Sequence, residues 1–162
     1  MSRLRDNPWV LPASLVVALL LGLLPLPALL QPLRPYWLAL VVAYWVIEDP
    51  DRVGLGFAFL VGLLADLAFG SLIGEQALRL VVMTFILQRF RARMRFFPLS
   101  QQALAIGALL LNDRIVTAAV HLTLGLPDPP GTAWLAPLVG LLLWAPVFLA
   151  LDALRLGQWR RR

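Results

Sequence analysis

Six long apolar segments, separated by short polar turns, constrain this chain most strongly. A helix that crosses a bilayer needs about 20 apolar residues, so six spans would use about 120 residues of the 162 in the chain. The sequence therefore predicts an all-α integral membrane protein, a single membrane domain over residues 1–162 with six transmembrane helices. The expected spans are 10–30, 35–47, 53–70, 73–90, 98–124 and 133–154.

The composition leaves little material for a water-exposed surface. Charged residues make up 14% of the chain and hydrophobic residues 60%, whereas a soluble domain has about 25% charged and 45–50% apolar residues. This balance excludes most soluble enzymes and disordered proteins, and it argues against a nucleic-acid partner despite the net charge of +5. With no cysteine and one histidine, we expect no disulfide, no metal site and no cofactor.

The arginines predict how the helices are oriented. In a six-span topology eleven of the fourteen lie on one side, two lie inside spans, and Arg34 alone lies on the other side. Because basic residues concentrate in cytoplasmic loops, both termini are predicted to be cytoplasmic. We also expect the first segment to be a retained helix, since it is longer than the apolar part of a usual signal peptide.

A basic loop is expected between the fourth and fifth segments. It could contact anionic lipid headgroups or dock an acidic cytoplasmic partner. Its four basic residues are Arg89, Arg91, Arg93 and Arg95.

Small residues recur at every fourth position of the third segment and therefore share one helix face. Such a stripe lets another helix approach closely. It predicts either packing inside the protein or a face for a partner, with a carboxylate as polar anchor. The stripe consists of Gly54, Ala58, Gly62, Asp66 and Gly70, and Gly74 follows at the same spacing.

Polar and charged side chains also lie inside the apolar segments, where an unpaired charge is costly. Two of these side chains are aspartates and two are arginines, so their charges cancel. We therefore expect a paired network in which Asp66 contacts Arg79 or Arg114. The network could fix helix register, bind a polar ligand or partner, or relay protons, although arginine holds its proton too firmly to shuttle it. Its members are Asp66, Arg79, Asn112, Asp113 and Arg114. His121, about two turns further along the fifth segment, is expected to hydrogen-bond between helices.

The sequence contains no recognisable catalytic motif. The GxSxG, HExxH and P-loop patterns are absent, and Ser14, Ser71 and Ser100 have no histidine beside them in the sequence. We therefore expect no catalytic residues and no enzyme activity.

Three stretches of the sequence form a recognisable pattern: "RPYWLALVVAYWV", "RVGLGFAFLVGLLADLAFGSLIGEQAL" and "ND" in the fifth segment. Through them the chain, most closely from Arg34 to Leu78, resembles the rod shape-determining MreD family. The resemblance implies a non-enzymatic integral-membrane scaffold of the bacterial cell-elongation machinery, in the inner membrane. Such a scaffold helps to maintain rod shape by linking MreC and peptidoglycan synthases to the cytoskeleton.

The partners that the resemblance implies are MreC, a single-span protein with a periplasmic domain, and more widely RodA, a class B penicillin-binding transpeptidase and MreB. The family is also similar to the six-helix substrate-binding subunits of ECF-type transporters. A substrate-binding subunit for a small, vitamin-like molecule therefore remains the alternative function.

Overall fold

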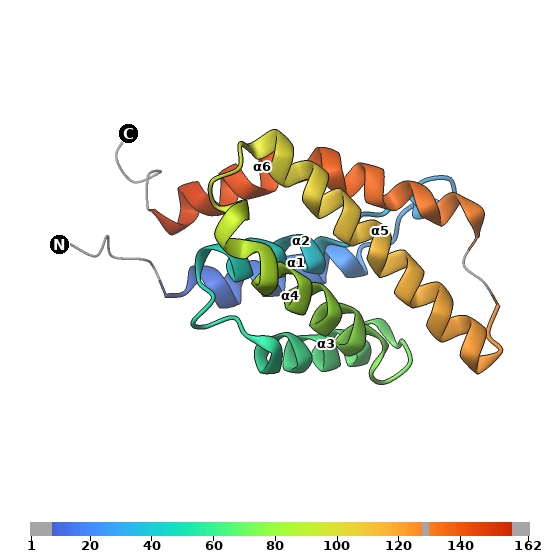
Figure 1. Ribbon diagram of the computed structural model, residues 1–162. Helices are drawn as coiled ribbons and strands as arrows, with labels where there is room; N and C mark the ends of the chain where they lie inside the picture. Colours follow the sequence, from blue (N-terminus) through green and yellow to red (C-terminus); the bar gives the residue numbers. More distant parts are fainter. Residues whose placement is uncertain (1–7, 128–129, 157–162) are drawn as a thin grey trace.

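The computed structural model describes residues 8–127 and 130–156. These residues form six α-helices and two short 3-10 helices, with no β-strand (Figure 1). The prediction of an all-α fold with six helices is confirmed. The helices are α1 (Val10–Leu23), α2 (Trp37–Glu48), α3 (Leu55–Phe69), α4 (Glu75–Met94), α5 (Leu99–Leu124) and α6 (Ala136–Arg155), with η1 (Gln31–Leu33) before α2 and η2 (Gly131–Leu135) before α6.

The first helix is shorter than the expected segment 10–30. It ends at Leu23, because Pro25 and Pro27 follow and a proline cannot continue the backbone hydrogen bonding of a helix. The residues up to α2 then form an irregular connection that contains η1. This connection contributes to the pocket described below.

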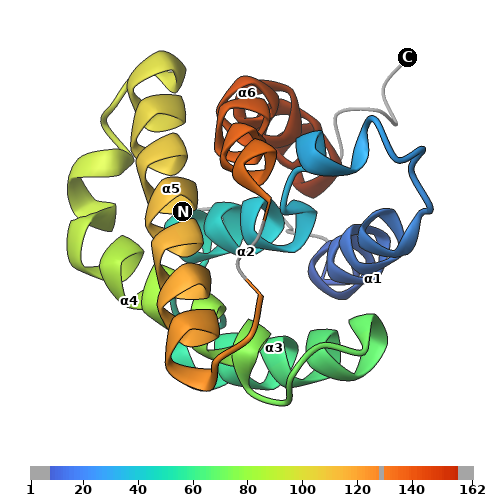
Figure 2. The ribbon, with the colours of Figure 1, turned by 90° about the vertical axis from the view of Figure 1, so that its right-hand side faces the viewer.

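The second helix, α2, lies at the centre of the bundle. Every residue from Leu38 to Ile47 is buried, and α2 packs mainly against α4 and α1, with further contacts to α6 and α5 (Figure 2). Its 12 residues correspond to about 18 Å at 1.5 Å per residue, less than the thickness of a bilayer core, about 30 Å. The other helices surround α2, which agrees with the apolar side chains on all of its faces.

The surrounding helices expose large apolar side chains. Leu67 on α3, Leu122 on α5 and Leu142 on α6 are each more than 70% exposed. Among the described residues, two helical stretches are long and apolar enough to cross a membrane: Leu99–Leu124, and Gly131–Arg155, which joins η2 to α6. An outward apolar surface of this kind suits a lipid environment.

Six described arginines lie at one end of the bundle, which we call the basic end: Arg52, Arg89, Arg91, Arg93, Arg95 and Arg155. There α2, α4 and α6 end and α3 and α5 begin (Figure 1). An ion pair of 3.0 Å joins Arg155 to Glu48, and the indole of Trp45 donates a hydrogen bond of 2.9 Å to Ser14. These contacts hold the ends of α6 and α2 and the start of α1 together.

The four arginines expected in a loop lie instead at the end of a helix. Arg89, Arg91 and Arg93 belong to α4, and Arg95 follows directly as its C-cap. Positive charges in the last turn of a helix are favourable, because the helix dipole is negative there. The expected boundary at residue 90 was therefore too early.

Candidate functional site

Asp66 closes the turn between α3 and α4. Its carboxylate accepts hydrogen bonds from the Ser71 hydroxyl at 2.8 Å, the Gly74 N–H at 2.7 Å and the Gln76 N–H at 2.8 Å. The first N–H groups of a helix have no partner within the helix, and a negative charge beside them is stabilising. Asp66 therefore caps α4 from the preceding helix, and the prediction that it pairs with Arg79 or Arg114 was wrong.

Two glycines make this capped turn possible. Gly70 has φ of 63° and Gly74 has φ of 99°, and L side chains rarely adopt such positive values. Gly70 and Ser71 both donate their N–H groups to the Asp66 carbonyl, which ends α3. The spacing of Asp66, Gly70 and Gly74 thus describes a turn rather than a continuous helix face.

The middle of the small-residue stripe packs inside the protein. Ala58 and Gly62 are buried, and Gly62 lies directly against the backbone of α4. A Cβ added to Gly62 would overlap Ala77, because it would lie only 2.6 Å from the Ala77 backbone nitrogen. Gly54, in contrast, has no atom within 4 Å of an added Cβ and precedes the helix as its N-cap. Of the two alternatives for this stripe, the structure supports internal packing at Ala58 and Gly62.

Arg79 and Asp113 form a buried ion pair between α4 and α5. Arg79 Nε donates to Asp113 Oδ1 at 2.7 Å and Nη2 donates to Oδ2 at 2.6 Å. Glu75 lies 3.8 Å from Arg79 Nη1, one turn earlier on α4. The guanidinium also stacks on the Tyr36 ring, with its Cζ 4.4 Å from the ring centroid, a cation–π contact.

His121 joins the edge of this cluster. Its Nε2 lies 3.7 Å from Glu75 Oε1 on α4, and its Nδ1 lies 3.0 Å from the Pro127 carbonyl. The predicted role of this histidine between helices stays a prediction, because 3.7 Å exceeds a hydrogen-bond distance.

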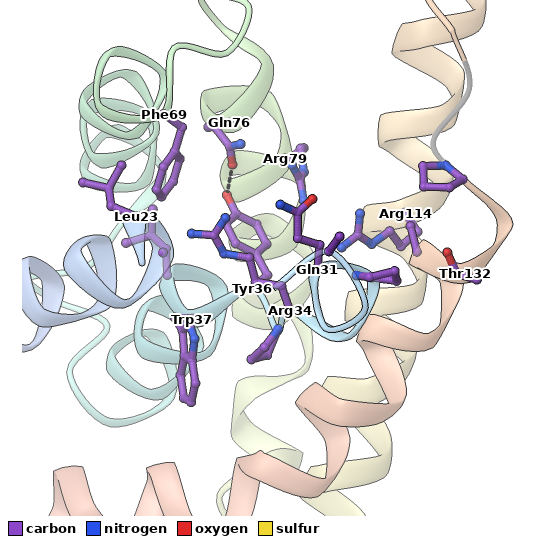
Figure 3. A pocket seen from close by; sticks show the side chains of 17 residues that line it. Leu23, Gln31, Arg34, Tyr36, Trp37, Phe69, Gln76, Arg79, Arg114 and Thr132 are labelled. Carbon is purple, nitrogen blue, oxygen red and sulfur yellow. Dashed lines mark hydrogen bonds between the residues drawn. The ribbon is translucent and has the colours of Figure 1, made fainter. Parts of the chain in front are cut away.

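A pocket of about 670 Å³ opens at the end of the bundle opposite the basic end, where α1 and α3 end and α2 and α4 begin. We call it the arginine pocket, because three arginines from different segments line it: Arg34 before α2, Arg79 on α4 and Arg114 on α5 (Figure 3). Its other polar lining side chains include Gln31, Tyr36 and Gln76, and the Tyr36 hydroxyl donates a hydrogen bond to Gln76.

The three arginines differ in their partners. Arg79 is occupied by Asp113, but within 8–127 and 130–156 neither Arg34 nor Arg114 has a carboxylate at ion-pair distance. The Nη2 atom of Arg34 is buried and has no hydrogen-bond acceptor. The charged side chains that line the pocket are therefore all arginines, and two of the three have no ion-pair partner among the described residues.

The predicted network is thus divided among separate places. Only Arg79 and Asp113 pair, Arg114 lines the arginine pocket, and Asn112 lies on another side of α5, in a groove with Phe90 and Leu109. Sequence reasoning missed Arg34 as a site residue. Its position as the single arginine on the side opposite the other eleven was the available signal.

Residues with the chemistry to hold a metal do not cluster in the described part of the chain. No group of three or more His, Cys, Asp or Glu side chains lies within reach of one ion there. The pocket instead offers guanidinium, amide and hydroxyl groups, which recognise anions and polar groups.

Comparisons with known proteins identify the family. No solved structure matches the chain. The rod shape-determining protein MreD of Haemophilus influenzae is 34% identical over 140 residues, which cover 86% of this chain and 86% of that protein. The family model described as rod shape-determining protein MreD matches residues 4–154. The chain therefore belongs to the MreD family of rod shape-determining proteins.

Proposed function

We propose that this protein is a non-enzymatic integral-membrane scaffold of the bacterial cell-elongation machinery. Family membership, which supports a role in rod shape determination, is the observation that carries the proposal. The geometry agrees with a structural role, because the carboxylates of Asp66 and Asp113 are engaged in hydrogen bonds that hold helices together. A carboxylate committed to such bonds is poorly placed to act as a general acid or base.

The proposed topology has six spans in the inner membrane, with both termini in the cytoplasm. The distribution of arginine supports it, because the basic end carries six described arginines, whereas the connections at the opposite end carry Arg34, and Arg79 and Arg114 belong to helices that line the pocket there. Under the positive-inside rule the basic end faces the cytoplasm. There its arginines also meet anionic lipid headgroups.

MreC is the proposed main partner, with RodA, the class B transpeptidase and MreB in a wider complex. The described residues leave little mass outside the helical bundle, so contacts with a single-span partner would be made mostly by helices within the bilayer. Association there depends on close packing and polar contacts. Since Gly62 already packs against α4 and Ala58 is buried, we propose that MreC meets a different, outward face.

Purification of the tagged protein from its native membrane tests this function. We expect MreC to co-purify in a fixed ratio and cells depleted of the protein to become round. A transport subunit would instead bring down an ATPase module and a bound small molecule. That result, with rod shape unchanged by depletion, would contradict the scaffold proposal in favour of the alternative.

A further inference from the structure

We propose that the arginine pocket binds a phosphate ester, with Arg34 and Arg114 holding the phosphate group. This inference goes beyond the scaffold function and does not depend on which partners the protein has. The phosphate could belong to the headgroup of a membrane lipid or to a soluble phosphate ester, and the two sources share the same recognition chemistry.

The charges that line the pocket are not balanced. Arg79 donates from Nε and Nη2 to Asp113, at 2.7 and 2.6 Å, and its Nη1 lies 3.8 Å from Glu75, so these three side chains together carry a net charge of −1. Arg34 and Arg114 add two positive charges, and no carboxylate of the described segments lies within ion-pair distance of either. The five groups together carry one net positive charge, and the two arginines that lack an ion-pair partner attract anions into the cavity.

Arg34 carries a donor that lacks an acceptor. Its Nη2 is buried and makes no hydrogen bond, and a buried donor left unpaired is destabilising. A bound anion would remove this cost by supplying the acceptor. The backbone of Arg34 is restricted, because Pro35 follows it directly and η1, which contains Pro32, precedes it.

Two guanidinium forks fit a phosphate group especially well. Each fork can donate two parallel hydrogen bonds to an oxyanion. Arg34 and Arg114 come from different segments and line the same cavity (Figure 3). The non-ester oxygens of a phosphate point in different directions from a tetrahedral centre, so two forks can approach the group from different sides, whereas the two oxygens of a carboxylate lie in one plane. Gln31 and Thr132, which also line the pocket, add neutral polar groups.

The size and the other walls of the pocket indicate that the phosphate is esterified. About 670 Å³ is much more than one phosphate needs, and Leu23, Leu38 and Phe69 form part of the lining. Leu23, the last residue of α1 and part of the lining, and Leu24, which follows it, are each about half exposed. The apolar part of an ester could therefore lie against this wall and continue along the outer surface of the bundle.

The test uses the full chain, purified in detergent and freed of lipid. The probes are phosphatidylglycerol, diacylglycerol without a phosphate, and glycerol 3-phosphate, each titrated and followed by native mass spectrometry. The variants are Arg34→Gln and Arg114→Gln. Arg52→Gln is the matched control, because it removes one arginine at the basic end whose side chain is 57% exposed and pairs with Asp49.

We expect phosphatidylglycerol to bind the wild type and the Arg52→Gln variant equally, and diacylglycerol not to bind. Each pocket variant should bind the phospholipid about tenfold more weakly, equivalent to about 1.4 kcal/mol. If glycerol 3-phosphate binds with the same dependence on Arg34 and Arg114, the pocket also accepts a soluble source. If only the phospholipid does, the ligand is a lipid headgroup.

Equal weakening in all three variants would show that the lipid binds by general attraction to arginine and would overturn the proposal, as would failure of every phosphate probe to bind. Arg34→Lys, which keeps the charge and loses the fork, is the second variant if Arg34→Gln does not accumulate. It should lose part of the affinity. None of these results depends on capture of MreC, so this test and the test of the scaffold function can fail independently.

Discussion

Arg79 on α4 and Asp113 on α5 meet through two parallel hydrogen bonds of 2.7 and 2.6 Å, with 8% and 3% of their side chains exposed. A guanidinium and a carboxylate in this arrangement satisfy each other's charge and geometry together. Removing one partner leaves the other charge buried and uncompensated, which typically costs about 3–5 kcal/mol. Replacing both with apolar residues avoids that cost.

A double-mutant cycle tests this pair. Arg79→Leu and Asp113→Leu should each lower the thermal stability and the abundance of the protein strongly, and the double variant should recover most of the loss. Arg52→Leu is the control, because its pair with Asp49 is exposed and exposed pairs contribute about 0–1 kcal/mol. Single variants as stable as this control would show that the pair does not hold α4 to α5.

Gly62→Ala should destabilise the protein because the new Cβ would overlap the backbone of Ala77. Overpacking of this kind costs about 1–3 kcal/mol or more. Gly56→Ala on the same helix is the matched control, since nothing lies within 4 Å of its added Cβ and alanine favours helix over glycine by about 1 kcal/mol. Abundance should fall for Gly62→Ala only, while MreC captured per molecule stays constant. Normal abundance with reduced capture would instead make Gly62 part of the partner face.

Asp66→Ala should weaken the connection between α3 and α4. It leaves the N–H groups of Gly74 and Gln76 without their acceptor, with a cost of about 2–4 kcal/mol from lost bonds and unpaired donors. Asp66→Asn should be intermediate, because its amide has one acceptor oxygen where the carboxylate has two. Ser71→Ala, which removes one bond, should cost least. Thermal unfolding of the purified variants gives this order, and an Asp66→Ala variant as stable as wild type would refute the capping role.

Reporter fusions test the proposed topology. Signals should alternate between the outer and the cytoplasmic side, starting outside, because successive connections lie at opposite ends of the bundle. A cytoplasmic signal in the connection between α5 and α6 would contradict six spans. The fusion points are after Leu30, Asp49, Ser71, Arg95, Pro129 and Arg162.

The positions of the helices could be predicted from the sequence because apolar length and prolines set them locally. Five of the six helices begin and end within a few residues of the expected segments, and the first ends early, at Leu23, shortly before Pro25. The central place of α2 was harder to predict. A helix that is apolar on all sides can face lipid or protein, and only the other helices decide which.

The partners of the charged residues could not be read from the sequence. Asp66 was expected to seek an arginine, but the turn that starts at Gly70 returns the chain so that backbone N–H groups reach it first. Arg114 follows Asp113 directly in the sequence, yet adjacent residues on a helix point about 100° apart, so one faces Arg79 and the other the pocket. The rotation of α5 about its axis decides which of the two residues faces Arg79, and the sequence pattern does not fix that rotation.

The scaffold proposal is tested most directly in cells whose native protein is replaced by a variant or depleted. Two quantities are measured there: the cell shape, and the amount of MreC that co-purifies with each molecule of the protein. Gly56→Ala should support rod shape and recover as much MreC per molecule as the wild type, and depletion without a replacement should give round cells. Rod-shaped cells after full depletion, or purified protein that carries no MreC, would contradict the account.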